Sequence, residues 1–186
     1  MEDQPYIHYN KGSLALYALR DLIGETAMNA ALAGFVSTYG FKSAPYPTSR
    51  DLVRVLTAAT PDSLRYAIGD LFETVTLWDL RTERVTSVRR PDGRYDVTIR
   101  GGAHKFRVDS LGVQHEVPVG DLVDLGVFGG DGVGGRPLWL GKVWVRRNDP
   151  VVTVTVNTKP ASAGFDPHVK LIDKDRRDNL AVPDDR

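Results

Sequence analysis

Histidine is the residue type in this chain best suited to hold a catalytic metal, and the chain has four. They are His8, His104, His115 and His168. A catalytic zinc site of the two-histidine, one-glutamate type needs two histidines one helical turn apart, as in His-Glu-x-x-His. No two histidines here are separated by three or four residues, and no His-Glu-x-x-His occurs. The sequence therefore predicts no metal site built by this chain alone.

Two other patterns are similar to ligand-binding loops but lack the residues that define them. Asp173, Asp175 and Asp178 have the spacing that opens an EF-hand calcium loop, but its glycine and its final glutamate are replaced by aspartates. We expect a turn in which these carboxylates accept backbone amides. The glycine-rich run at 126–135 lacks the Gly-Lys-Ser/Thr ending of a phosphate-binding loop, so it predicts a mobile hairpin loop.

Tyr9 is the remaining side chain that could act in catalysis. A phenol near a metal-polarised carbonyl can donate a hydrogen bond to the oxyanion that forms there. Its hydroxyl must be held rigidly, and Tyr9 directly precedes an apolar stretch, Lys11 to Ile23, that predicts a packed helix. A tyrosine before a helix also serves for packing alone, and the residues by themselves leave both roles open.

Composition excludes several classes of function. Lys and Arg number 24, as do Asp and Glu, so the net charge is zero and no basic surplus exists to bind nucleic acid. The absence of cysteine excludes disulfides, thiolate metal sites and cysteine nucleophiles. The polar start Met1 to Pro5 is no signal peptide, and the most apolar window, Leu14 to Ile23, is too short to span a bilayer. We therefore expect a soluble piece.

The first half of the chain has the period of a helix. Gly24 and Gly40 suit helix ends, and Thr26 and Ser49 are the expected N-caps of the second and third helices. On the second helix the apolar residues from Met28 to Tyr39 are expected to share one buried face. Four helices are predicted, at about 11–23, 26–39, 50–59 and 61–72.

After Glu73 the apolar period becomes two, which indicates strands. Pro91-Asp92-Gly93 predicts a hairpin turn with glycine at positive φ. Strands are expected at 74–78, 85–88, 95–99, 105–108, 114–117, 122–128, 138–145 and 151–157, with coil from Pro160 to Arg186. The predicted fold is α+β: a small helical unit at 1–74, then an antiparallel immunoglobulin-like β-sandwich with a coil tail at 75–186.

Tyr9, Lys11 and Gly12 form a Tyr-x-Lys-Gly element, and the helix after it ends in Ile23-Gly24. This combination resembles the segment that follows the zinc site in M1-family (gluzincin) aminopeptidases. The resemblance extends over nearly all of the chain, through 47–52, 70–77, 163–167, 171–173 and 178–179. The C-terminal set is similar to a bacterial subgroup whose peptidase is often fused behind an ABC-transporter-type membrane permease.

The resemblance implies that the chain is the C-terminal region of a zinc aminopeptidase that removes residues from peptide N-termini. Tyr9 would stabilise the tetrahedral intermediate, while the zinc ion and the general-base glutamate would belong to an N-terminal catalytic domain absent from this sequence. The chain alone is then expected to be inactive. The first helix would pack under that domain, the sandwich would shape or shield the cleft, and the parent could be anchored to a bacterial membrane.

One further expectation follows from this hypothesis, and one alternative to it stays open. Helical faces that normally meet the catalytic domain would be exposed here, which predicts self-association of the isolated chain. The alternative to the peptidase is a stand-alone, non-enzymatic module whose sandwich binds protein partners. A His-Glu-x-x-His encoded upstream would favour the peptidase, and a genuine start codon at Met1 would favour the module.

Overall fold

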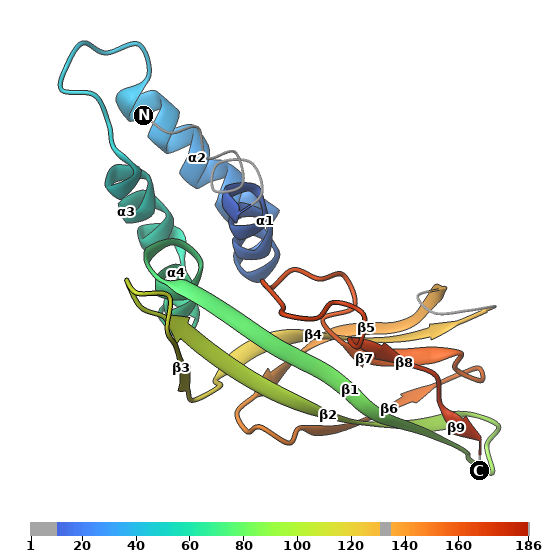
Figure 1. The fold of residues 1–186 in the computed structure, drawn as a ribbon. Helices are drawn as coiled ribbons and strands as arrows, with labels where there is room; N and C mark the ends of the chain where they lie inside the picture. Colours follow the sequence, from blue (N-terminus) through green and yellow to red (C-terminus); the bar gives the residue numbers. More distant parts are fainter. Residues whose placement is uncertain (1–10, 131–134, 186) are drawn as a thin grey trace. The chain divides into compact units, whose positions relative to one another are not determined.

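The computed structural model describes residues 11–130 and 135–185 of the 186-residue chain (Figure 1). The chain divides into two compact units, Met1–Val75 and Thr76–Arg186. The first unit is helical and the second consists of two β-sheets. The fold is therefore α+β with sandwich-like sheets, as the change of period after Glu73 predicts.

From residue 11 onward, the helical unit contains three regular α-helices and a final irregular helical run. In chain order the elements are α1 (Gly12–Ile23), α2 (Glu25–Tyr39), α3 (Ser49–Ala59), the 3₁₀ turn η2 (Asp62–Leu64), α4 (Tyr66–Ile68) and the π-helical η3 (Gly69–Glu73). The single helix predicted at 61–72 is thus wrong. Pro61 is extended (ψ 145°) and lies before the run, and the amide and hydroxyl of Thr74 both bond to the Gly69 carbonyl, five residues back.

Both predicted N-caps are wrong by one or two residues. α2 begins directly after Gly24, whose φ of 88° and ψ of 153° are accessible almost only to glycine, so no capping side chain at Thr26 is used. α3 is capped by Thr48 instead of Ser49. Thr48 and Asp51 form a reciprocal capping box, in which the Thr48 amide donates to Asp51 Oδ2 at 2.8 Å.

α2 packs against both α1 and α3. Its buried residues are Met28 and Ala31, and Phe35 and Tyr39 are half-buried with ring centroids 5.0 Å apart. Val36 is 59% exposed, although the helical spacing predicts that it faces inward. The apolar face of α2 is therefore only partly covered in the described residues.

The described residues of the second unit form nine strands, which pair into two sheets (Figure 1). One sheet has the order β3-β2-β1-β9, with β6 also paired to β2, and the other has the order β5-β4-β7-β8. The strands are β1 (Val75–Arg89), β2 (Tyr95–Val108), β3 (Gln114–Val117), β4 (Asp121–Gly129), β5 (Arg136–Val145), β6 (Val151–Val156), β7 (Ser162–Phe165), β8 (Leu180–Ala181) and β9 (Asp184–Asp185). The short β1–β9 pair is parallel.

Three features of the sheets bear on the sequence predictions. The hairpin at Pro91-Asp92-Gly93 is confirmed, with Gly93 at φ 87°. β1 and β2 are each one long strand where two short strands were expected. The coil predicted from Pro160 onward is wrong, because it contains the fully buried strand β7. Its Ser-Ala-Gly sequence has no alternating apolar pattern, so periodicity could not reveal it.

The core of the second unit also contains a buried ion pair. Lys105 of β2 donates to Asp121 of β4 at 2.9 Å, and both side chains are almost fully buried. The Lys105 ammonium lies 5.5 Å from the centre of the Trp78 ring. β2 and β4 belong to different sheets, so this pair joins the two sheets across the core.

Candidate functional site

The lysine of the Tyr-x-Lys-Gly element holds the start of α1 in place. Lys11 immediately precedes α1, and its ammonium donates a hydrogen bond to the Thr74 carbonyl at 3.1 Å. Partial burial lowers the pKa of Lys11 through desolvation. Because Thr74 is itself bonded to Gly69, the contact ties the start of α1 to the last turn of the helical unit. The chain is therefore held in place two residues after Tyr9.

Tyr9 and His8 lie outside the described residues. The catalytic role expected for Tyr9 therefore stays a prediction.

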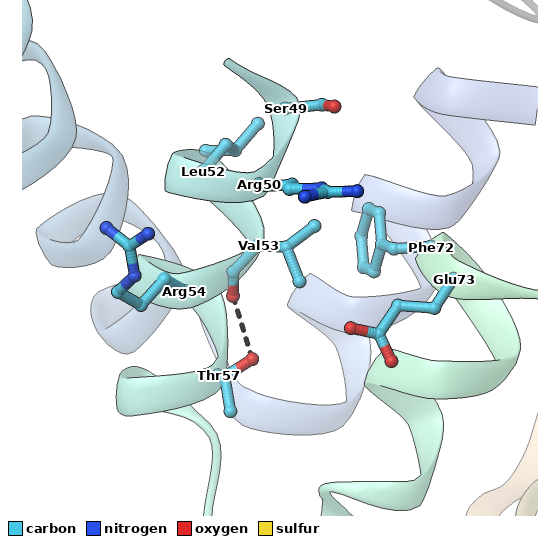
Figure 2. A pocket seen from close by; sticks show the side chains of 8 residues that line it. All are labelled: Ser49, Arg50, Leu52, Val53, Arg54, Thr57, Phe72 and Glu73. Atoms are coloured by element: carbon cyan, nitrogen blue, oxygen red, sulfur yellow. Dashed lines mark hydrogen bonds between the residues drawn. The ribbon is translucent and has the colours of Figure 1, made fainter. Parts of the chain in front are cut away.

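A groove of about 670 Å³ lies in the helical unit, between α3 and η3 (Figure 2). We call it the α3–η3 groove and define it by its lining residues: Ser49, Arg50, Leu52, Val53, Arg54, Thr57, Phe72 and Glu73. Arg50, Val53, Arg54 and Thr57 follow the i, i+3, i+4, i+7 spacing of one helix face, so the regular winding of α3 brings them together.

The middle of the groove is apolar and its sides are charged. Figure 2 shows Val53 and Phe72 facing each other, with Arg50 on one side of the Phe72 ring and Glu73 on the other. Arg54 is directed away from Phe72 and pairs with Asp51 at 3.0 Å. Within the described residues, neither Arg50 nor Glu73 has an ion pair. As far as the described part of the chain extends, the groove thus offers one unpaired cation and one unpaired anion.

Sequence reasoning missed this groove. The spacing of Arg50, Val53 and Thr57 along α3 was visible, but Phe72 and Glu73 lie about twenty residues further on. The irregular turn η3 directs them toward α3, and no repeating pattern signals such a turn. Nothing in the sequence therefore indicated that Arg50 and Glu73 share one cavity.

The aspartates at 173–178 form the capping turn that was expected. Asp173 Oδ1 accepts the Asp175 amide at 3.2 Å, and Asp175 Oδ1 accepts the Arg177 amide at 3.1 Å. Desolvation raises the pKa of Asp173 to about 6, whereas the Arg177 side chain lowers the pKa of Asp175 to about 2. Asp173 also accepts the Leu80 amide through Oδ2 at 3.3 Å, so the turn is fastened to β1.

Each histidine in the described residues contacts a different side chain. His104 lies 2.6 Å from Glu116, His115 lies 2.8 Å from Asp109, and the ring of His168 meets the edge of Phe128. Across residues 11–130 and 135–185 no three His, Asp or Glu side chains gather as a metal ion would require. The M1 resemblance places the zinc ligands outside these residues, and we derive no catalytic step from the described histidines.

The glycine-rich run divides at the end of a strand. Gly126 to Gly129 belong to β4, so this part of the predicted loop is strand, and Gly130 follows at φ 97°. Positions 131–134 lie outside the described residues, and the mobile hairpin loop expected there stays a prediction.

The comparisons with known proteins leave the family open. Neither the scan against protein-family models nor the search of curated proteins gives a match to this sequence. None of the helices in the described part of the chain is long and apolar enough to cross a membrane.

Proposed function

We propose that this chain is the C-terminal region of an M1-type zinc aminopeptidase and that Tyr9 is its oxyanion donor. The Lys11 contact supports this proposal most directly. A tyrosine that acts on a transient charge must be held rigidly. In the Tyr-x-Lys-Gly element the lysine is half-buried and bonded to Thr74, and this contact fixes the start of α1.

In this proposal the phenol of Tyr9 donates a hydrogen bond to the oxygen of the tetrahedral intermediate during peptide-bond hydrolysis. The zinc ion and the general-base glutamate belong to a catalytic domain N-terminal to Tyr9, which is also the partner of the helical unit. The peptide enters between that domain and this chain, and the sandwich shapes or shields the entrance. The bacterial origin and a membrane-anchored parent are parts of the same proposal.

The immunoglobulin-like type of the sandwich is also proposed. Two sheets of mainly antiparallel strands support it. The parallel β1–β9 pair is a departure from that type, and it involves only two residues of each strand.

The decisive experiment uses the longer reading frame that contains this chain. Tyr9→Phe should lower kcat by about 10²–10³, or roughly 3–4 kcal/mol, because one oxyanion donor is lost. KM should change far less, since the bound substrate carries no such charge. Zinc content should stay the same, because Tyr9 is not proposed as a ligand.

Tyr17→Phe and Tyr6→Phe are the matched controls. Tyr17 lies on α1, is 47% exposed and stacks with Arg20, so its hydroxyl has no proposed role in the reaction. Both control variants should keep most of the activity. If Tyr9→Phe behaves like them, the assignment of Tyr9 is wrong.

The isolated chain provides an independent test. Purified without chelator, it should bind no stoichiometric zinc and hydrolyse no aminoacyl substrate, because the zinc-binding residues lie elsewhere in this proposal. Metal analysis and an aminopeptidase assay measure both properties. One tightly bound zinc per chain together with turnover would overturn the proposal.

A second candidate function is a stand-alone interaction module. Its sandwich would bind protein partners, and apolar side chains exposed on the sandwich favour this function: Leu111 is 86% exposed and Leu140 is 47% exposed. Either function allows self-association of the isolated chain through apolar side chains exposed on the helical unit, such as Phe41 and Tyr46, which sedimentation at rising concentration would detect. An upstream reading frame with His-Glu-x-x-His favours the peptidase, and a genuine start codon at Met1 favours the module.

A further inference from the structure

The α3–η3 groove has two charged groups that the described part of the chain does not use. Arg50 and Glu73 line the groove without an ion pair in the described residues, and Phe72 lies between them in Figure 2. Arg54 lines the same groove, but Asp51 already binds its guanidinium at 3.0 Å. A charged ligand in the groove would therefore meet Arg50 as its cation and Glu73 as its anion.

The remaining groups in the groove narrow the chemistry of such a ligand. Leu52, Val53 and Phe72 are half-buried and supply only apolar surface. The Thr57 hydroxyl donates to the Val53 carbonyl at 2.8 Å, so its proton is already used. A ligand that matches this groove has a negatively charged group to pair with Arg50 and a positively charged group to pair with Glu73. Between the two charged groups it has apolar atoms.

The size of the groove adds a third constraint. Its 670 Å³ lies within the range of about 300–1,000 Å³ that is typical of small-molecule sites and exceeds what one amino acid fills. A short peptide with free termini has the required properties: an ammonium at one end, a carboxylate at the other, and side chains between them. Arginine binds carboxylates through two parallel hydrogen bonds, which suits a C-terminal carboxylate.

We propose that the α3–η3 groove binds short peptides of a few residues, with the C-terminal carboxylate on Arg50 and the N-terminal ammonium on Glu73. This site is separate from Tyr9 and from the peptidase assignment. It requires only the helical unit, no metal and no upstream domain.

Calorimetric titration of the full chain with trileucine tests the proposal. Arg50→Met and Glu73→Gln should each weaken binding about three- to tenfold, because each removes one charged contact at a solvent-exposed residue. Arg65→Met is the matched control: Arg65 belongs to the helical unit, does not line the groove and is paired with Asp62 at 3.0 Å, so affinity should be unchanged. Circular dichroism verifies that the three variants keep their helices.

Blocked peptides assign each end of the ligand. N-acetyl-trileucine retains only the carboxylate, so its binding should respond to Arg50→Met and not to Glu73→Gln. Trileucine amide retains only the ammonium and should show the opposite response. Peptide blocked at both ends should bind weakest of the four.

Several outcomes would overturn the inference. If the doubly blocked peptide binds as well as trileucine, the groove is merely apolar. If Arg65→Met weakens binding as much as Arg50→Met, any loss of positive charge has this effect and the assignment of Arg50 is wrong. If a blocked peptide with internal lysine and aspartate binds more tightly than trileucine, the occupant is a protein segment and not a free peptide. None of these results depends on zinc or on Tyr9, so the peptidase proposal would be unaffected.

Discussion

The helical unit and the sandwich unit differ most in how their cores are built. Among the described residues, twelve large side chains are fully buried, and only Leu19 and Leu56 of these lie in the helical unit. Two of the three buried residues of α1 are alanines, which remove little apolar surface from water. The sandwich buries Trp78, Phe165 and a set of branched aliphatic residues. The sandwich therefore has the larger hydrophobic contribution to stability.

Hydrogen bonds show the same contrast. In the helical unit the side-chain bonds are mostly local, such as Thr60 to the Leu56 carbonyl, and Lys11 to Thr74 is an exception. In the sandwich they join distant segments, as when Thr82 donates to the Asn179 carbonyl at 2.6 Å. Short helices depend on tertiary packing for their stability. We therefore expect the helical unit to unfold at lower denaturant concentration than the sandwich.

The two units can be followed separately in one sample. All three tryptophans, Trp78, Trp139 and Trp144, lie in the sandwich unit, so tryptophan fluorescence reports on that unit alone. Helical circular dichroism reports on the other unit.

The largest effect is expected for Phe165→Ala in the sandwich. Phe165 lies on β7 and is 1% exposed, and the edge of its ring closely approaches the position that a Cβ would take at Gly101. Its truncation should lower the free energy of unfolding by about 3–5 kcal/mol, since it leaves a cavity in the core. The tryptophan transition should move to much lower denaturant.

Leu111→Ala is the control for this change. Leu111 is 86% exposed in the turn between β2 and β3, so the expected change is within about 0.5 kcal/mol. Equal effects of the two substitutions would mean that β7 does not lie in the core.

Leu56→Ala should produce the next largest effect, in the helical unit. Leu56 of α3 is fully buried, and its truncation should cost about 2–5 kcal/mol. The circular dichroism transition should move while the tryptophan transition stays in place, because Leu56 belongs to the core of the helical unit. If both signals move together, the units unfold as one cooperative body and the comparison between them fails.

The elements with regular patterns were the predictable part of this fold. α1, α3 and the hairpin at Pro91-Asp92-Gly93 were all expected, because helical period and turn residues are local signals. The strand β7 was missed for the opposite reason. The position of β7 depends on close packing against a segment that is distant in the sequence. A Cβ at Gly164 would lie 1.8 Å from the Asn179 carbonyl oxygen, so only glycine fits there. No local pattern encodes such a fit.

The candidate sites divide in the same way. The turn at Asp173 and Asp175 was predicted because a carboxylate that accepts the amide two residues on is a local interaction. The α3–η3 groove was not predicted, because Arg50 and Glu73 belong to separate elements brought together by tertiary structure. Tyr9 was proposed from a resemblance to a family, and its role awaits the kinetic test.

The pH dependence of the sandwich should show a smaller effect, centred on Asp173. Burial raises its pKa from 3.8 to about 6, so the folded state holds a proton that the unfolded chain has already released. The stabilisation is fully present below pH 3.8 and is lost as the pH rises through about 6. Its loss should amount to roughly 1–2 kcal/mol after allowance for solvent screening.

The difference between wild type and Asp173→Asn isolates this contribution. Tryptophan-detected unfolding should show the difference between the two proteins changing through the window that ends near pH 6. Asp175→Asn is the control, because the pKa of Asp175 is lowered to about 2 and its titration falls in another window. A flat difference curve for Asp173→Asn would show that its carboxylate is not desolvated.

The smallest change in stability is expected at the start of α3, where substitutions of two neighbouring residues should differ in their effect. Thr48→Ala should destabilise the helical unit by about 1 kcal/mol, because the capping box with Asp51 is lost. Ser49→Ala should change stability by much less, since Ser49 is the first helical residue and the capping box does not use its hydroxyl. The sequence pattern predicts Ser49 as the N-cap of α3, whereas the structure assigns the N-cap to Thr48. Comparing the two substitutions therefore tests which assignment is right. Circular dichroism should detect the change while tryptophan fluorescence does not, because the cap lies in the helical unit.

If Ser49→Ala proves the more damaging substitution, α3 begins one residue later than the structure shows. Thr48 would then lie outside the cap, and the Thr48–Asp51 capping box would not contribute to the stability of α3.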